Sequence, residues 1–158
     1  MSIAIEMAAL FRRDIGRLIQ EIRAFPTDKM LWETLPGATN SGGNLALHLE
    51  GNLRDFIGRQ LGDVAYVRQR ELEFSAREIP ASELAARLEE VQDLVFRALS
   101  EVPASRWDEI YPMNALGTEL TVRQFVLHLY GHLSYHLGQL DYLRRVLSGA
   151  GALPFARL

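Results

Sequence analysis

The sequence predicts an all-α fold in which four main helices form a bundle. Apolar residues recur at steps of three and four in four long stretches, the period of a helix with one buried face. Short segments rich in proline, glycine and polar residues separate these stretches, and almost nothing alternates as a half-buried strand would. With 158 residues, 48% of them hydrophobic and 23% charged, the chain is expected to form one domain spanning residues 1–158.

The first main helix approaches Pro26, which ends it. Its apolar stripe consists of Met7, Phe11, Ile15, Leu18, Ile22 and Phe25. Thr27 and Asp28 can cap a short second helical piece that runs through Trp32. The Pro36-Gly37 pair then closes this piece.

The second main helix is predicted over residues 44–61, after the cap cluster at residues 40–43 and before a stop at Gly62. Residues 63–79 form a connection with room for one helical turn. Several charged side chains of this connection are interpreted as solvated surface, with an alternative role for the arginines in holding an anionic substrate. They are Arg68, Arg70, Glu71 and Glu73.

The third main helix is predicted over residues 82–100, and Pro103 follows it. Between residues 107 and 120 the helical period breaks, which indicates a small hairpin or an extended loop with a tight turn at residues 114–117. Thr121 and Gln124 then have the spacing of a capping box, so a long fourth helix should run to about Leu147. The connections do not by themselves establish a simple up-down-up-down order.

The fourth helix carries three of the four histidines of the chain, His128, His132 and His136, at successive steps of four. Four residues are slightly more than one turn, so the imidazoles lie on one face, about 6 Å apart along the axis. A helical wheel places them in the same sector as Phe125 and Leu143, and therefore toward the bundle interior or its mouth. Imidazole is the commonest metal-binding side chain.

His48, on the second main helix, can meet His132 and His136 if the two helices are neighbours. Three imidazoles would leave coordination positions for water or substrate, the arrangement of catalytic rather than structural zinc, and a six-coordinate ion fits equally well. His128 is expected outside the ligand set, because three consecutive turns span about 12 Å. The alternative is that all four are hydrogen-bonded core histidines.

Polar residues near these histidines are candidates for orienting them or nearby waters. They are Gln139, Asn44 and Asn52. The alternative for Gln139 is a hydrogen bond to a neighbouring helix.

Composition excludes several other kinds of site. The chain has no cysteine, which removes disulfides, thiolate ligands and a cysteine nucleophile. A net charge of −3 argues against a nucleic-acid partner. No apolar run is long enough for a membrane span, and the N-terminus does not read as a signal peptide, so a cytoplasmic location is expected. The Glu-x-x-His pairs of di-iron bundles and the His-Glu-x-x-His motif of zincins are also missing.

Two motifs resemble those of the DinB-like (DinB/YfiT-type) metal-binding superfamily, and look closest to its uncharacterised branches. They are Asn44-x3-His48-x3-Asn52 and His132-x-x-Tyr135-His136-x-Gly138-Gln139. The similarity includes the Arg-Glu-x-Glu-Phe run at residues 70–74 and extends over residues 32–147. Leu137 stands where the common form of the motif has arginine, a departure that leaves the histidines intact.

The resemblance implies an up-down-down-up four-helix bundle in which His48, His132 and His136 hold a divalent ion, often nickel or zinc. Iron and manganese also suit the donor set. The resemblance further implies a homodimer and, in some relatives, transferase or isomerase activity with thiols such as bacillithiol or mycothiol.

The first functional hypothesis is a metal-dependent transferase that uses a low-molecular-weight thiol as cosubstrate and an electrophile as acceptor. A metal-dependent hydrolase is a close variant of it. The alternatives from other classes are a non-catalytic metal-binding or stress-associated interaction protein and, third, a bis-histidine haem protein.

Overall fold

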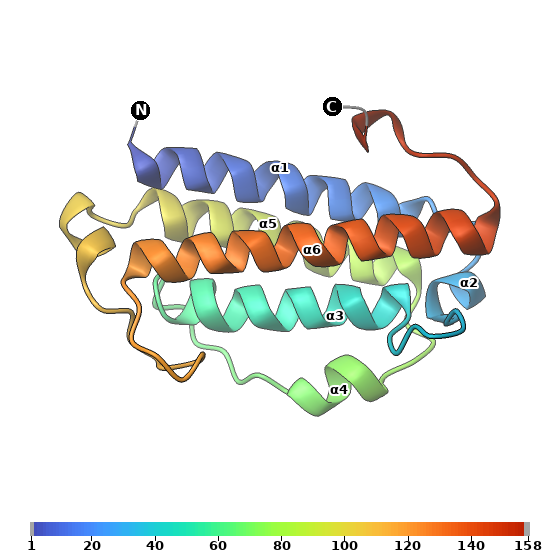
Figure 1. Ribbon diagram of the computed structural model, residues 1–158, viewed down its shortest axis with the longest axis horizontal. Helices are drawn as coiled ribbons and strands as arrows, with labels where there is room; N and C mark the ends of the chain where they lie inside the picture. The colour runs from blue at the N-terminus through green and yellow to red at the C-terminus, as the bar shows by residue number, and fades with distance from the viewer. Residues whose placement is uncertain (1, 157–158) are drawn as a thin grey trace.

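The computed structural model describes residues 2–156. Four long helices pack side by side, with α3 and α5 antiparallel to α1 and α6 (Figure 1). They are α1 (Ile3–Arg23), α3 (Gly42–Leu53), α5 (Ala81–Ser100) and α6 (Val122–Ser148). Both α1 and α3 pack against α5 and α6, so the four helices form a ring around one core. The predicted bundle and its up-down-down-up order are confirmed.

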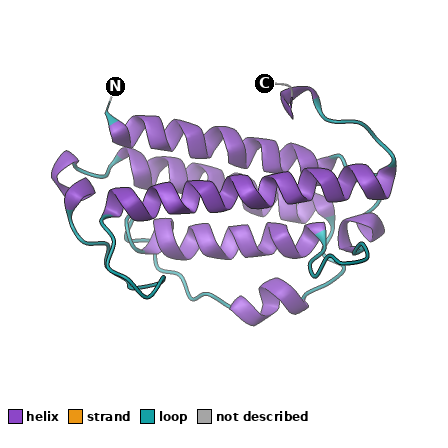
Figure 2. Cartoon of the chain, viewed as in Figure 1, coloured by secondary structure: helices purple, strands orange, loops and turns teal. Residues whose placement is uncertain are grey.

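Shorter helices lie in the connections, and Figure 2 shows the remaining joins as loops. The short piece before the first loop is α2 (Asp28–Trp32), and the connection between α3 and α5 contains α4 (Arg70–Ser75). A 3₁₀ turn (Ala104–Asp108) follows α5, and another (Pro154–Ala156) follows α6. The single helical turn expected between residues 63 and 79 is therefore α4.

The long fourth helix begins and ends as its sequence predicts. The Thr121 side chain accepts a hydrogen bond from the Gln124 backbone N–H, and the Gln124 side chain accepts one from the Thr121 backbone N–H, which completes the capping box. At the other end Gly149 has a φ of 70°, a left-handed conformation that suits glycine. Local sequence is therefore sufficient to position both ends of α6.

The second main helix differs from its prediction. Its α-helical part ends at Leu53, and a π-helical segment, Arg54–Arg59, continues it. Within this segment the backbone passes very close to α5, because a Cβ on Gly58 would lie 2.8 Å from the Leu94 side chain. The residues stay helical, but their wider turn could not be read from an apolar period.

The segment before α6 is a minimal hairpin. The Tyr111 N–H donates to the Leu120 carbonyl at 2.8 Å, and the Val122 N–H donates to the Glu109 carbonyl at 2.9 Å. The Tyr111 ring stacks on Phe125 with ring centroids 4.0 Å apart. These contacts fasten the predicted hairpin or extended loop to the first turn of α6.

The core is formed by the apolar stripes that the sequence predicts. The α1 residues Met7, Phe11, Ile15, Leu18 and Ile22 are all buried. On α6 the buried stripe includes Phe125, Leu129, Leu140 and Leu143, which places the histidine-bearing face toward α3. Among the described residues, no helix combines the length and apolar character needed to cross a bilayer.

A buried carboxylate, Asp14, joins α1 to α6. It accepts hydrogen bonds from Arg13 Nε at 2.8 Å and from the Tyr130 hydroxyl at 2.8 Å, while Arg17 Nη1 lies 3.1 Å away. Burial raises the pKa of Asp14, but the bonds from Arg13 and Tyr130 outweigh it and hold the pKa below its ordinary value of 3.8.

We expect Asp14→Asn to lower the free energy of unfolding by about 1–3 kcal/mol near pH 7. Because the folded-state pKa is depressed, the ionised carboxylate stabilises the fold above about pH 4 and loses this effect as the pH falls through the folded value. Urea denaturation should therefore show a deficit that shrinks in acid. Asp93→Asn, which breaks only an exposed pair with Arg12, is the control. An equal deficit at pH 3 and pH 7 would contradict this role.

Candidate metal centre

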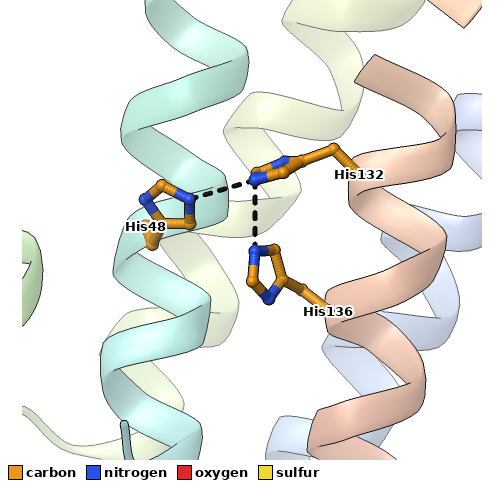
Figure 3. A group of neighbouring side chains, drawn as sticks. All are labelled: His48, His132 and His136. Atoms are coloured by element: carbon orange, nitrogen blue, oxygen red, sulfur yellow. Dashed lines mark hydrogen bonds between the residues drawn. The ribbon is translucent and has the colours of Figure 1, made fainter. Parts of the chain in front are cut away.

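Three imidazoles from two helices meet in the seam between α3 and α6 (Figure 3). His132 Nε2 lies 3.2 Å from His48 Nε2 and 3.1 Å from His136 Nε2. One nitrogen of each ring lies within 4.8 Å of the other two. The structure thus brings together the three residues that the sequence predicts as ligands.

Both helices hold these side chains on buried faces. Every residue of α3 is buried, including His48, which is 8% exposed. Ser41 caps α3, and its hydroxyl accepts a hydrogen bond from the Asn44 N–H at 3.2 Å. On α6, the four-residue spacing places His132 and His136 on successive turns of the face that packs on α3.

His48 is oriented by a carboxylate from α4. Its Nδ1 lies 2.9 Å from Glu73 Oε2, and Arg68 binds both oxygens of Glu73, at 2.6 Å through Nε and 2.8 Å through Nη2. Burial raises the pKa of Glu73, but the bonds from Arg68 and His48 outweigh it and lower that pKa below its usual range. An ionised carboxylate only accepts, so Nδ1 of His48 carries a hydrogen, and in the neutral ring this leaves Nε2 with a lone pair toward the centre.

His136 has an equivalent partner on its own helix. Gln139 Oε1 lies 2.7 Å from His136 Nδ1 and accepts its hydrogen. The tautomer that follows again leaves Nε2 with a lone pair directed at His132. Gln139 therefore forms a hydrogen bond with His136, one of the candidate metal ligands. The alternative, that it bonds only a neighbouring helix, is not observed.

His132 lies between these two lone pairs. Burial first, and then repulsion from His136 and His48, lowers the pKa of His132 to about 4, so its ring is neutral near pH 7. Its Nδ1 is buried and has no hydrogen-bond partner among the described residues. A neutral His132 ring carries one N–H hydrogen, which cannot form full hydrogen bonds to both neighbouring lone pairs. If that hydrogen is on Nδ1, the Nε2 lone pairs of all three rings point at one another. A cation among them would remove that conflict.

The distances from His132 Nε2 to the other two nitrogens fit a small metal ion. Ligand nitrogens at about 2.0–2.1 Å from an ion lie about 3.3 Å apart in a tetrahedral site and about 3.0 Å apart when they share one face of an octahedron. The observed 3.1 and 3.2 Å lie between these values. Imidazole nitrogens suit zinc, nickel and iron.

A pocket of about 240 Å³ opens beside His132, at the end of the α3–α6 seam that lies nearer the hairpin. Its wall includes Asn52, Phe56, Arg68, Arg70 and His128. His128 is exposed, and its ring centroid is 6.5 Å from that of His132. It therefore lies on the pocket wall and not in the group of converging nitrogens, as helix geometry predicts.

The interpretation of Arg68 and Glu73 as solvated surface is wrong. Glu73 is 5% exposed, and the Arg68 side chain is 13% exposed. Both are covered because α4 folds back onto α3, where Asn44 Nδ2 donates to the backbone carbonyls of Glu73 at 3.0 Å and of Ala76 at 3.3 Å. Only the family-like run at residues 70–74 signalled that this segment has a role.

The two asparagines beside His48 differ in what they do. Asn44 anchors the backbone of α4 and orients the histidine only indirectly, through the position of Glu73. Asn52 lies in the wall of the pocket, and its Oδ1 is buried without a hydrogen-bond partner in the described part of the chain. That oxygen is available to a molecule in the pocket.

Comparison with known proteins finds one matching family model and a similar solved structure. The family model described as the DinB superfamily matches residues 10–140. The structure is similar to the crystal structure of a DinB-like protein from Bacillus cereus ATCC 10987, with a TM-score of 0.67, 18% sequence identity and coverage of 89% of each chain. No curated protein matches the sequence.

Proposed function

Because the chain belongs to the DinB superfamily, we propose that it holds one divalent transition-metal ion through His48, His132 and His136. The observation that carries this proposal is the convergence of three imidazoles, two of which are held by hydrogen bonds to Glu73 and Gln139 so that their Nε2 atoms point at the third ring. Such outer contacts orient metal-binding histidines and increase their basicity. Nickel and zinc are the leading candidates for the ion.

Elemental analysis of the freshly purified protein tests this site. We expect about one equivalent of transition metal in the wild type and in His128→Ala, and almost none in His48→Ala or His132→Ala. His128→Ala is a matched control because it removes an imidazole from the same helix that lies outside the converging group. Circular dichroism of each variant establishes that it is folded. Equal metal in all four proteins, or metal in none, would overturn the proposal.

We further propose that the protein is a metal-dependent transferase with a low-molecular-weight thiol as cosubstrate. A bound divalent ion supplies an open position that lowers the pKa of a thiol placed there. The pocket beside His132 provides access, and Arg70 on its wall makes no ion pair with any described residue. Arg70 can therefore bind a carboxylate of the thiol.

The pocket lining offers few groups that could accept a proton during the reaction. It has no aspartate or glutamate to act as general base on a water molecule. Glu73, the nearest carboxylate described at the site, is occupied by His48 and Arg68. His128 remains as the proton acceptor on the wall. In the proposed step the thiol loses its proton to His128, sulfur forms a bond to the electrophilic carbon, and the leaving group departs with the electron pair of its bond to that carbon.

We expect His128→Ala to retain its metal while its rate of thiol transfer falls at least tenfold, because general base catalysis typically contributes more than this factor. The measurement is thiol conjugation to a panel of electrophiles, with metal-loaded protein and the metal content determined in parallel. His128→Gln should not rescue the rate. Transfer by His128→Ala at the wild-type rate would remove this residue from the mechanism, and absence of transfer in metal-loaded wild type would refute the transferase.

A further inference from the structure

A second pocket, of about 410 Å³, lies beside Gln139, the hydrogen-bond partner of His136, on the side of the seam away from His128. It is lined by the segment that joins α2 to α3 and by the C-terminal half of α6. Figure 1 shows these two parts of the chain at the right-hand end of the bundle. The volume of the pocket is within the range of small-molecule sites. The pocket is called the neutral pocket below, because none of the residues that line it is charged. Those residues are Leu35, Gly37, Ala38, Thr39, Asn40, Leu45, Gln139, Tyr142, Leu143 and Val146.

The neutral pocket connects directly to the candidate metal centre through Gln139. The same side chain lines the pocket and accepts the hydrogen bond from His136 Nδ1 at 2.7 Å. On α3, Leu45 lies one turn from His48 and faces the pocket. Since a helical turn advances about 5.4 Å, the pocket begins about one turn from the converging nitrogens.

The two ends of the seam differ in charge. The pocket on the His128 side has Arg68 and Arg70 in its wall, whereas the neutral pocket has no charged group. Large apolar side chains of the neutral pocket also face solvent, with Tyr142 64% and Val146 60% exposed. An apolar ligand would cover them, and the transfer of apolar area out of water would stabilise the complex.

We propose that the neutral pocket binds an alkyl or aryl group of the electrophilic substrate. This inference rests on the proposed transferase, for which it names the class of acceptor: a molecule with an apolar tail and an electrophilic carbon at one end. The tail lies along Leu45, Tyr142 and Val146, which places the reactive end beside His136. The thiol enters from the opposite pocket, so the two reactants meet at the histidines.

The test uses straight-chain alcohols as probes on isotope-labelled protein, both metal-free and metal-loaded, with amide chemical shifts as the readout. We expect 1-butanol and 1-hexanol to shift the amides of Ala38, Leu45 and Val146. Since each buried methylene contributes about 0.8 kcal/mol, the Kd should fall about fourfold per methylene. Val146→Glu should weaken 1-hexanol binding at least tenfold. Leu127→Glu, at an exposed apolar position on α6 outside the pocket, should not.

Chain-length dependence separates this inference from the transferase itself. In the transfer assay, lengthening the alkyl group of the electrophile should raise kcat/KM in the wild type and not in Val146→Glu. If alcohols bind but no thiol is transferred, apolar binding in the neutral pocket is supported and the transferase is refuted. Amide shifts outside the neutral pocket, or a Kd independent of chain length, would overturn the apolar site whether or not transfer occurs.

Discussion

Arg144→Ala is expected to lower the free energy of unfolding by about 3–5 kcal/mol, the largest loss of stability among the substitutions considered, because it leaves a buried charge without its partner. The Arg144 and Glu21 side chains are 1% and 0% exposed, and Arg144 Nε donates to Glu21 Oε2 between α6 and α1. Burial raises the pKa of Glu21 even with Arg144 present. Without the guanidinium, Glu21 must either protonate or be solvated by local opening.

Urea denaturation with an unchanged m-value measures this loss. Arg145→Ala is the matched control, since Arg145 is 34% exposed and its ion pair among the described residues is with the partly exposed Asp141. This substitution should cost less than about 1 kcal/mol. The double variant Glu21→Leu with Arg144→Met should recover most of the stability, because it removes both charges. A loss equal to that of Arg145→Ala would mean that the pair contributes little to the fold.

Gly51→Ala is expected to reduce metal affinity by about 10–100-fold, the size of effect typical for lost outer contacts of a metal-binding histidine. A Cβ at position 51 would lie 2.2 Å from Glu73 Oε1, so the carboxylate must move. Glu73 cannot move without releasing His48 Nδ1 or the two bonds from Arg68. The variant therefore disturbs the orientation of His48 without altering any of the three histidines.

Calorimetric titration with zinc or nickel measures the affinity. Gly138→Ala provides the control, since it makes the same substitution on α6 beside the site, where a Cβ meets nothing within 4 Å. It should bind metal normally and gain about 0.5–1 kcal/mol of stability from the better helix former. Glu73→Gln, which leaves space at Gly51 but removes the carboxylate charge, should also weaken binding. Wild-type affinity in Gly51→Ala would show that the contact between Glu73 and His48 does not tune the site.

The helices were predictable because their signals are local. The apolar period of α1 and α6, the capping box at Thr121 and Gln124, and the glycine at position 149 each act within a few residues. The π-helical segment after Leu53 was not predictable, because it accompanies a close approach between Gly58 and Leu94 on a different helix. The spacing of apolar residues within 44–61 does not predict that contact.

At the candidate site, too, the local features were predictable from the sequence and the tertiary contacts were not. The spacing of His132 and His136 determines by itself that the two rings lie on one face, one turn apart. It also explains why His128, a further turn away, lies on the pocket wall. Glu73 and Arg68 were misread because charged side chains in a connecting segment are usually solvated, and only the folding of α4 onto α3 buries them.

The sequence by itself therefore determined the four-helix architecture, the ends of α6 and the histidine pair on its inner face, since all of these follow from helical geometry over short distances. The tertiary structure alone decided that His48 meets this pair, that Glu73 and Arg68 orient it, and that a cationic and a neutral pocket lie at opposite ends of the seam. The contacts of His48 join residues far apart in the chain, 25 positions for Glu73 and 84 for His132. They depend on side-chain packing between helices, including the space left by the missing Cβ of Gly51, which no local pattern encodes.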